Sequence, residues 1–202
     1  MTETFAQNFT YLLKKHLLRR LPGRAAFKTR APTDEEIASV RIMHDRFFEH
    51  KVFRVNYDTY DMRRDQDSIN PDTHPDVMFA APPGSGHPFM YARVLRIFHV
   101  YACRVDETTT EATGELVQVL WVRWFELDPS VEGGFAARRL HRLRWPALDD
   151  EPFGFVSPKD VIRGCHLMAD ENYGQSDSGI PGPTLARPED EDLDWKFHRV
   201  GM

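Results

Sequence analysis

Two long segments, residues 87–105 and 116–127, constrain the fold more than any other part of the chain. Both are rich in β-branched and aromatic residues, and neither contains Gly or Pro after its second residue. The polar residues 106–115 between them have the composition of a surface loop. Apolar side chains fall on both faces of each expected strand, as the adjacent Leu120 and Trp121 do, which is typical of strands inside a sheet. We therefore expect a β-hairpin in the core.

The length and composition indicate a folded protein of ordinary size. With 202 residues the chain fits one domain with terminal additions, or at most two small domains. Its 41% hydrophobic and 12% aromatic residues suffice for a sizeable core, so we expect disorder only locally. The chain has neither an apolar run of membrane length nor the pattern of a secretory signal. We therefore expect an intracellular protein, nuclear or cytoplasmic, in which Cys103 and Cys165 are reduced core residues.

Charge is distributed unevenly along the chain. The formal net charge of -5 disfavours nucleic-acid binding over the whole surface. Residues 14–30 are nevertheless basic, whereas residues 170–194 are acidic. The apolar residues of 3–21 recur at helical spacing before Pro22-Gly23, which predicts a basic amphipathic helix. Its basic face is either solvated or in contact with an anionic partner.

Short helices and strands are expected around the central hairpin. Thr33 and Glu36 have the spacing of a capping box, which predicts a short helix over 34–40. Residues 51–58 alternate like a strand, and residues 40–50 fit both helix and strand.

The remaining segments alternate between loops and short elements. Residues 59–76 lack apolar periodicity and predict an irregular loop, made rigid by local hydrogen bonds of Asp and Asn side chains. Ser157 is expected to cap a single helical turn that ends at Gly164. The leucine spacing of 135–145 fits both a helix and a bulged strand, of which we favour the strand. Further short strands are expected at 77–81 and 165–168.

The sequence contains no recognised catalytic motif. A phosphate-binding glycine loop, a CxxC pair, an HExxH motif and a nucleophile elbow are all missing. We therefore expect a non-enzymatic protein without a cofactor or a metal. One alternative is an iron-dependent oxygenase, because His74 and Asp76 have the spacing of two facial-triad ligands and His141 or His166 could supply the third.

Arginine and aromatic residues make up the candidate binding site. Guanidinium groups bind phosphate or carboxylate, and aromatic faces hold a cation or stack on a base. These features fit a surface for peptides, chromatin or nucleic acid. The alternative is that the tryptophans belong to the core and the arginines to a solvated face. The candidate residues are Arg63, Arg64, Arg93, Arg96, Arg123, Trp124, Arg138, Arg139, Arg142 and Trp145.

Four segments between residues 87 and 168 follow one another in a recognisable order. They are YARVLRI, VQVLWVRWF, the Arg- and Leu-rich RRLHRL, and DVIRGCHLM. This order resembles a bromo-adjacent homology domain. The resemblance implies a distorted β-barrel that binds histone tails, nucleosomes or partner proteins and has no catalytic activity. RRLHRL stands where the family usually has Glu-Leu, so the chain departs from the family at its usual ligand surface.

Longer strings resemble another group of proteins. HKVFRVNYDTYDMRRDQDSINPDTHPDVM, HPFMYARVLRIFHV and FGFVSPKDVIRGCHLM are similar to a C-terminal region of uncharacterised proteins of mushroom-forming fungi. That region is often associated with transposase-like sequences of the Kyakuja-Dileera-Zisupton or Plavaka kind. The final LDWKFHRVGM resembles the start of a segment that elsewhere continues past an Asp-Arg-Asp motif, so we expect a stand-alone or a truncated copy. The resemblance supplies no transposase catalytic acids within these residues.

Together these patterns predict a mainly β (α+β) fold, a distorted and partly open barrel with an N-terminal helix and short peripheral helices. We expect three parts, which are a basic helix and linker (1–32), the barrel (33–169) and a flexible acidic tail (170–202), with Trp195 and Phe197 docking back on the core. The expected function is that of a nuclear interaction module of a mobile-element system. Its expected partner is chromatin, DNA or a protein, and no membrane. The alternatives are the iron oxygenase and a decayed fragment without retained activity.

Overall fold

The computed structural model confirms a mainly β fold. Strands account for 48% of the chain and helices for 15%. The structure describes residues 3–22, 30–59, 61–105, 114–134, 136–148, 151–178, 180, 184, 186–187 and 192–201, with side chains from residue 9 onward.

Two helices and fourteen strands are found in the described residues. The helices are α1 (Glu3–Leu18) and α2 (Asp34–Ala38), with 3₁₀ turns η2 (Met43–Asp45), η4 (Pro158–Asp160) and η5 (Glu171–Tyr173). The strands are β1 (Val40–Ile42), β2 (Phe48–His50), β3 (Phe53–Asp58), β4 (Arg64–Ile69), β5 (Asp76–Ala80), β6 (Phe89–Arg104), β7 (Glu115–Leu127), β8 (Arg142–Arg144), β9 (Phe153–Val156), β10 (Val161–Gly164), β11 (His166–Ala169), β12 (Gln175–Ser176), β13 (Asp194–Trp195) and β14 (Phe197–Gly201).

The predicted hairpin is the centre of the sheet. β6 and β7 pair antiparallel from Tyr91 opposite Phe125 to Ala102 opposite Glu115, with an irregularity between Val94 and Arg96. An extra residue at such a bulge changes which face the following side chains occupy, which explains why the sequence shows no clean alternation. The other edge of β6 pairs with β5, β2 and β1, and that of β7 with β9 and β8.

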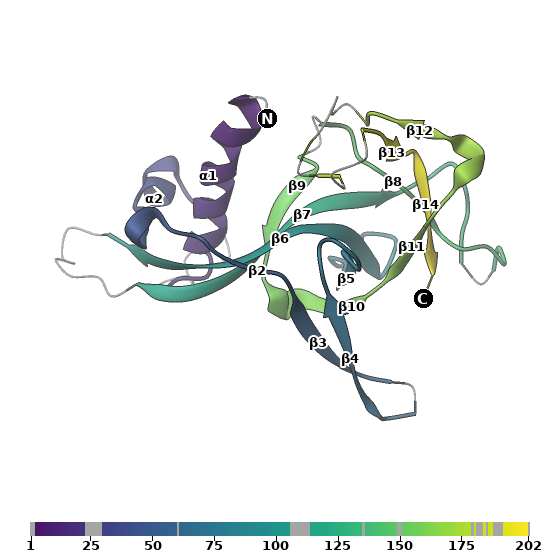
Figure 1. Ribbon diagram of the computed structural model, residues 1–202, viewed down its shortest axis with the longest axis horizontal. Coiled ribbons are helices and arrows are strands. Elements are labelled where there is room, and N and C mark those ends of the chain that lie inside the picture. Colours follow the sequence, from purple (N-terminus) through teal and green to yellow (C-terminus); the bar gives the residue numbers. More distant parts are fainter. Residues whose placement is uncertain are drawn as a thin grey trace.

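One stretch of chain, residues 161–169, lies at both ends of the sheet. The strand order is β10-β5-β6-β7-β8-β14-β11, and β10 and β11 are separated in sequence only by Cys165. β10 pairs with β5, whereas β11 pairs with β14. Among the described strands the two ends of this order do not pair with each other, so the sheet is not closed into a barrel. The light green ribbon of this stretch crosses between the two edges (Figure 1).

The predicted N-terminal helix covers one end of the central hairpin (Figure 1). Leu13, Leu17 and Leu21 are fully buried and pack in one cluster with Val100 and Val119 of β6 and β7. The predicted capping box is confirmed, because the Thr33 side chain accepts from the Glu36 amide and the Glu36 side chain accepts from the Thr33 amide.

Residues 64–69 correct the expectation of an irregular loop. They form β4, which pairs along its whole length with β3 from Phe53 opposite Ile69 to Asp58 opposite Arg64. Ile69 is the only apolar residue of β4 and also its only buried one. The hydrophobic pattern of a strand is therefore missing from this segment. The β3–β4 hairpin projects from the body of the protein (Figure 1).

The structure decides one segment that the sequence left open and changes the bounds of two others. Residues 40–50, which fitted both helix and strand, form β1, a 3₁₀ turn and β2. Of 135–145 only 142–144 are a strand, and residue 135 lies outside the described residues. The helical turn after Ser157 is confirmed, but it ends at Asp160 and residues 161–164 continue as β10.

The expected flexible tail is wrong for residues 194–201. These residues form β13 and β14, and β14 lies in the sheet between β8 and β11. His198 and Val200 are buried, so alternate residues of β14 face the core. In the part of the chain that the structure describes, no helix is long and apolar enough to cross a membrane.

We expect the last strand to be required for folding. A chain that ends at Leu193 lacks β14, which pairs with both β8 and β11. It also lacks Asp194 and leaves the buried Arg123 without its carboxylate, so its free energy of unfolding should be lower by at least about 3 kcal/mol. Urea unfolding followed by circular dichroism measures this. A chain that ends at Gly201 is the control, and equal midpoints for the two chains would contradict the expectation.

Candidate functional site

Trp145 lies where several of the predicted binding residues meet. It follows β8 and is buried, with 8% of its surface exposed. Its ring stacks on Phe125 with 3.9 Å between centroids, and the guanidinium carbon of Arg123 lies 3.8 Å from its ring centroid. The guanidinium carbon of Arg93 lies 5.4 Å from that centroid. Arg93, Arg123 and Trp145 are therefore brought together as one group.

The two arginines of this group are held by carboxylates. Arg93 and Arg123 are opposite each other on β6 and β7, where like charges repel. Arg93 donates from Nε and Nη2 to Asp76 at 2.8 and 3.1 Å. Arg123 and Arg187 each donate to Asp194 Oδ2 at 2.9 Å. Burial lowers the pKa of Arg123, against the effect of Asp194.

Arg123 is thus a structural residue. It is fully buried, and a buried charge is tolerated only with a partner that compensates for its lost hydration. A partner molecule at the surface has no access to it.

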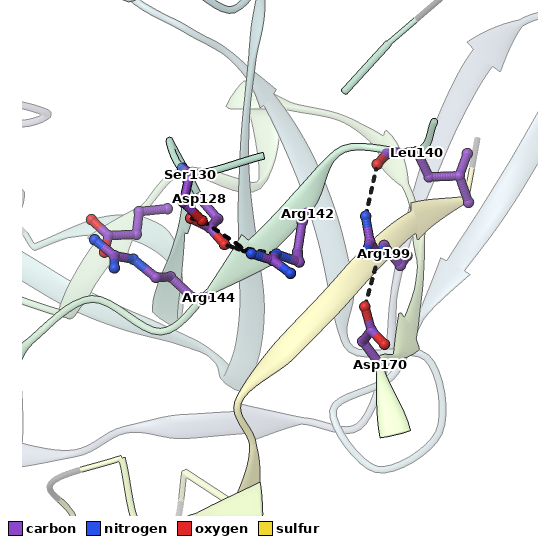
Figure 2. Close-up of polar contacts among 8 residues, drawn as sticks. Asp128, Ser130, Leu140, Arg142, Arg144, Asp170 and Arg199 are labelled. Carbon is purple, nitrogen blue, oxygen red and sulfur yellow. Dashed lines mark hydrogen bonds and ion pairs between the residues drawn. The ribbon is translucent and has the colours of Figure 1, made fainter. Parts of the chain in front are cut away.

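A second set of ion pairs crosses one face of β7, β8 and β14 (Figure 2). Arg142 is buried and donates from Nε to Asp128 at 2.7 Å and from Nη2 to Ser130 Oγ at 3.1 Å. Arg199, opposite Arg142 on β14, donates from Nε to Asp170 at 2.9 Å. Burial would raise the pKa of Asp128, but hydrogen bonds from Ser130 and Arg142 bring it below the usual value. These guanidinium groups are already occupied by carboxylates.

The other predicted residues lie apart from Trp145. Arg63 pairs with Asp61 at 3.0 Å, and Arg96 pairs with Glu49 at 3.2 Å. The ten predicted residues do not form one continuous surface, since they are spread over the β3–β4 hairpin (Arg63, Arg64), β6 (Arg93, Arg96), β7 (Arg123, Trp124), the turn before β8 (Arg138, Arg139) and β8 with the residue after it (Arg142, Trp145).

An open pocket of about 630 Å³ lies beside Trp145. Trp145, Leu148 and Phe197 contribute its apolar walls, and Arg144 and Lys196 its positive charges. The volume is in the range of pockets that bind small molecules or side chains of a partner, about 300–1,000 Å³. We call this hollow the Trp145 pocket.

The Arg144 side chain has a fixed position at this pocket. Glu126, Arg144 and Phe197 are aligned across β7, β8 and β14. Arg144 donates from Nε to Glu126 at 2.6 Å, and both side chains are partly exposed. Arg144 and Lys196 are the cations among the described lining residues, and Glu126 is the anion.

Two buried polar atoms near the pocket have no partner. Trp145 Nε1 and His198 Nδ1 make no hydrogen bond within the described residues, and their rings lie 5.6 Å apart. A buried donor without a partner costs about 1–3 kcal/mol. Trp145 Nε1 is shielded from solvent, so Trp145 contributes to the pocket as an apolar wall.

A second hollow of about 610 Å³ lies between α1 and β1, with Lys14, Arg41 and Phe47 among its lining residues. None of the residues predicted for binding lines it. The Trp145 pocket is therefore the better candidate.

The residues considered for an iron site are not arranged as one. Both carboxylate oxygens of Asp76 accept from Arg93, and the exposed His74 is hydrogen-bonded to Thr73. Within the described ranges no three His, Cys, Asp or Glu residues are grouped as a metal site would require. Cys103 and Cys165 are both free thiols, and burial raises the pKa of Cys165 to about 12.

Sequence reasoning missed the residues that hold the arginines. Asp194 and Arg187 lie in a segment whose acidic, Pro- and Gly-rich composition suggested a flexible tail. The aromatic and β-branched residues Trp195, Phe197 and Val200 were the available signal of a strand. Asp128 and Asp170 follow strands in turns, where carboxylates are ordinarily solvated.

No protein-family model, curated protein or solved structure matches the chain at a significant level.

We expect Asp194 to stabilise the fold and Glu126 to contribute little. Asp194→Ala leaves Arg123 buried without its carboxylate and should lower the free energy of unfolding by about 3–5 kcal/mol. Glu126→Ala breaks a partly exposed pair and should cost less than about 1 kcal/mol. Urea unfolding of both variants checks this, and similar losses in the two would contradict a special role for the buried pair.

We expect His198 to make the protein sensitive to acid. Burial, with help from Arg93, lowers its pKa from 6.5 to about 4. Between these pH values the unfolded chain binds the proton more strongly than the folded chain, so stability falls as the pH decreases through this window. His198→Phe should reduce that loss by up to about 1.4 kcal/mol per pH unit.

Chemical denaturation at a series of pH values measures this slope. His16, whose pKa burial also lowers to about 4, contributes equally in both proteins and leaves a residual slope. An unchanged slope in His198→Phe would show that His198 is not the group that titrates.

Proposed function

We propose that the chain is a non-enzymatic interaction module that binds an extended segment of a partner protein at the Trp145 pocket. The observation that carries the proposal is an open pocket with aromatic and apolar walls and two cations. Apolar walls with a few fixed polar groups are typical of ligand sites. The nuclear setting and the association with a mobile element rest on the sequence resemblances and belong to the same proposal.

A partner protein is better supported than DNA. Arg93, Arg123 and Arg142, which were candidates for phosphate binding, are engaged by Asp76, Asp194 and Asp128. The net charge of -5 adds a general repulsion of phosphates. These guanidinium groups are buried or partly buried and already neutralised by a carboxylate, which weakens their attraction for a phosphate.

A histone tail is also a poor match for this pocket. Histone tails are rich in lysine and arginine, whereas the pocket presents Arg144 and Lys196 against the single carboxylate of Glu126. Like charges at an interface suppress binding. Among the partners that the resemblance to bromo-adjacent homology domains suggests, a non-histone protein segment fits best.

Selection from a displayed library of random peptides tests the proposal. We expect selected peptides to bind the wild-type protein and to lose at least about tenfold in affinity with Ala147→Trp, which fills the pocket from its wall. Ala136→Trp places the same side chain at an exposed position outside the pocket and should leave the affinity unchanged.

Histone peptides, nucleosomes and duplex DNA at low salt complete the panel. Binding to DNA or nucleosomes without any selected peptide would reject the proposal, and so would peptides that bind Ala147→Trp as well as wild type. Fluorescence anisotropy gives the affinities, and circular dichroism confirms that both variants fold.

A further inference from the structure

We infer that the Trp145 pocket recognises the side-chain carboxylate of an aspartate or glutamate in the bound segment, an inference that rests on the peptide-binding function proposed above. Two cations, Arg144 and Lys196, face one anion among the described lining residues. This local excess of positive charge stands in a chain whose net charge is -5. The charge of the pocket therefore complements an acidic ligand.

Arg144 is prepared for such a ligand by its neighbours. Glu126 accepts from Arg144 Nε alone, and a guanidinium has five N–H donors. The remaining donors have no other partner in the described part of the chain, so they are available to a second carboxylate. Because β7 and β14 fix Glu126 and Phe197 on either side, little side-chain entropy is lost when a ligand binds.

Lys196 adds a second cation to the site. Lys196 lies between β13 and β14, its backbone N–H donates to the Gly174 carbonyl at 3.2 Å, and its side chain is exposed. Hydrogen bonds to an ionised acceptor are about twice as strong as those to a neutral one. The pocket therefore distinguishes a carboxylate from the amide of the same shape.

Oriented peptide libraries with one fixed central residue provide the test. We expect the library with fixed Glu to bind at least about tenfold more tightly than the library with fixed Gln. Libraries with fixed phosphoserine, and with a free C-terminal carboxylate in place of the side chain, separate the other anionic sources. Equal binding of the Glu and Gln libraries, or a preference for phosphoserine without a preference for Glu over Gln, would overturn the inference.

Variants of the pocket give changes of opposite sign. Lys196→Ala should abolish most of the preference for Glu over Gln, and Lys159→Ala, an exposed lysine outside the pocket, should leave it intact. Glu126→Gln removes the carboxylate that competes for Arg144 and should strengthen binding of the Glu library. If Glu126 has only a structural role, Glu126→Gln should weaken binding or leave it unchanged. Either result would count against the inference.

The two proposals fail in different ways. If peptides bind and are sensitive to Ala147→Trp but show no preference for Glu, the interaction module stands and the carboxylate inference falls. If no peptide library binds, both fall together.

Discussion

The burial of one guanidinium group determines the arrangement of a large part of this protein. Arg123 lies in β7 of the longest hairpin, opposite Arg93, and has no exposed surface. A charge in that place is stable only if a carboxylate and an aromatic face replace its hydration. Asp194 and Trp145 supply them, so the end of the chain and the segment after β8 are both drawn onto the hairpin.

The same requirement explains why an arginine-rich sheet is not a row of free cations. Arg93, Arg142 and Arg199 each have a carboxylate from a neighbouring strand or turn, at 2.7 to 2.9 Å. Pairing of this kind holds adjacent strands together and leaves little net positive charge on the face. Arg144 differs because one Nε–H alone is engaged and the group borders an open pocket. A functional surface is therefore expected where the pairing is incomplete.

The elements with strong apolar patterns were predictable, and those whose stability depends on partners were not. β6, β7 and α1 contain enough apolar residues at regular spacing to be recognised before any contact is known. β4 is polar along its length and is a strand only because β3 pairs with it. Residues 161–169 looked like a turn followed by a strand because nothing local indicates that β5 and β14 pair with its two halves.

For the candidate site, the sequence indicated the residue types but not their roles. It identified Arg123, Arg142 and Trp145 as unusual, and it left open whether they faced a ligand or belonged to the interior. The two arginines can be buried because Asp194 pairs with Arg123 and Asp128 pairs with Arg142. These pairs form only when β8 and β14 take their places in the sheet.

The sequence by itself determined a mainly β protein built on one central hairpin with an amphipathic helix at its end, because apolar periodicity acts over a few residues. Only the tertiary structure decided which charges are buried and paired, since the pairs of Arg93, Arg123 and Arg142 join residues that are 17, 71 and 14 positions apart. It also decided that the acidic end of the chain belongs to the sheet. The buried guanidinium of Arg123 accounts for this, because its carboxylate comes from Asp194, 71 residues further along the chain, and no local pattern could have revealed that contact.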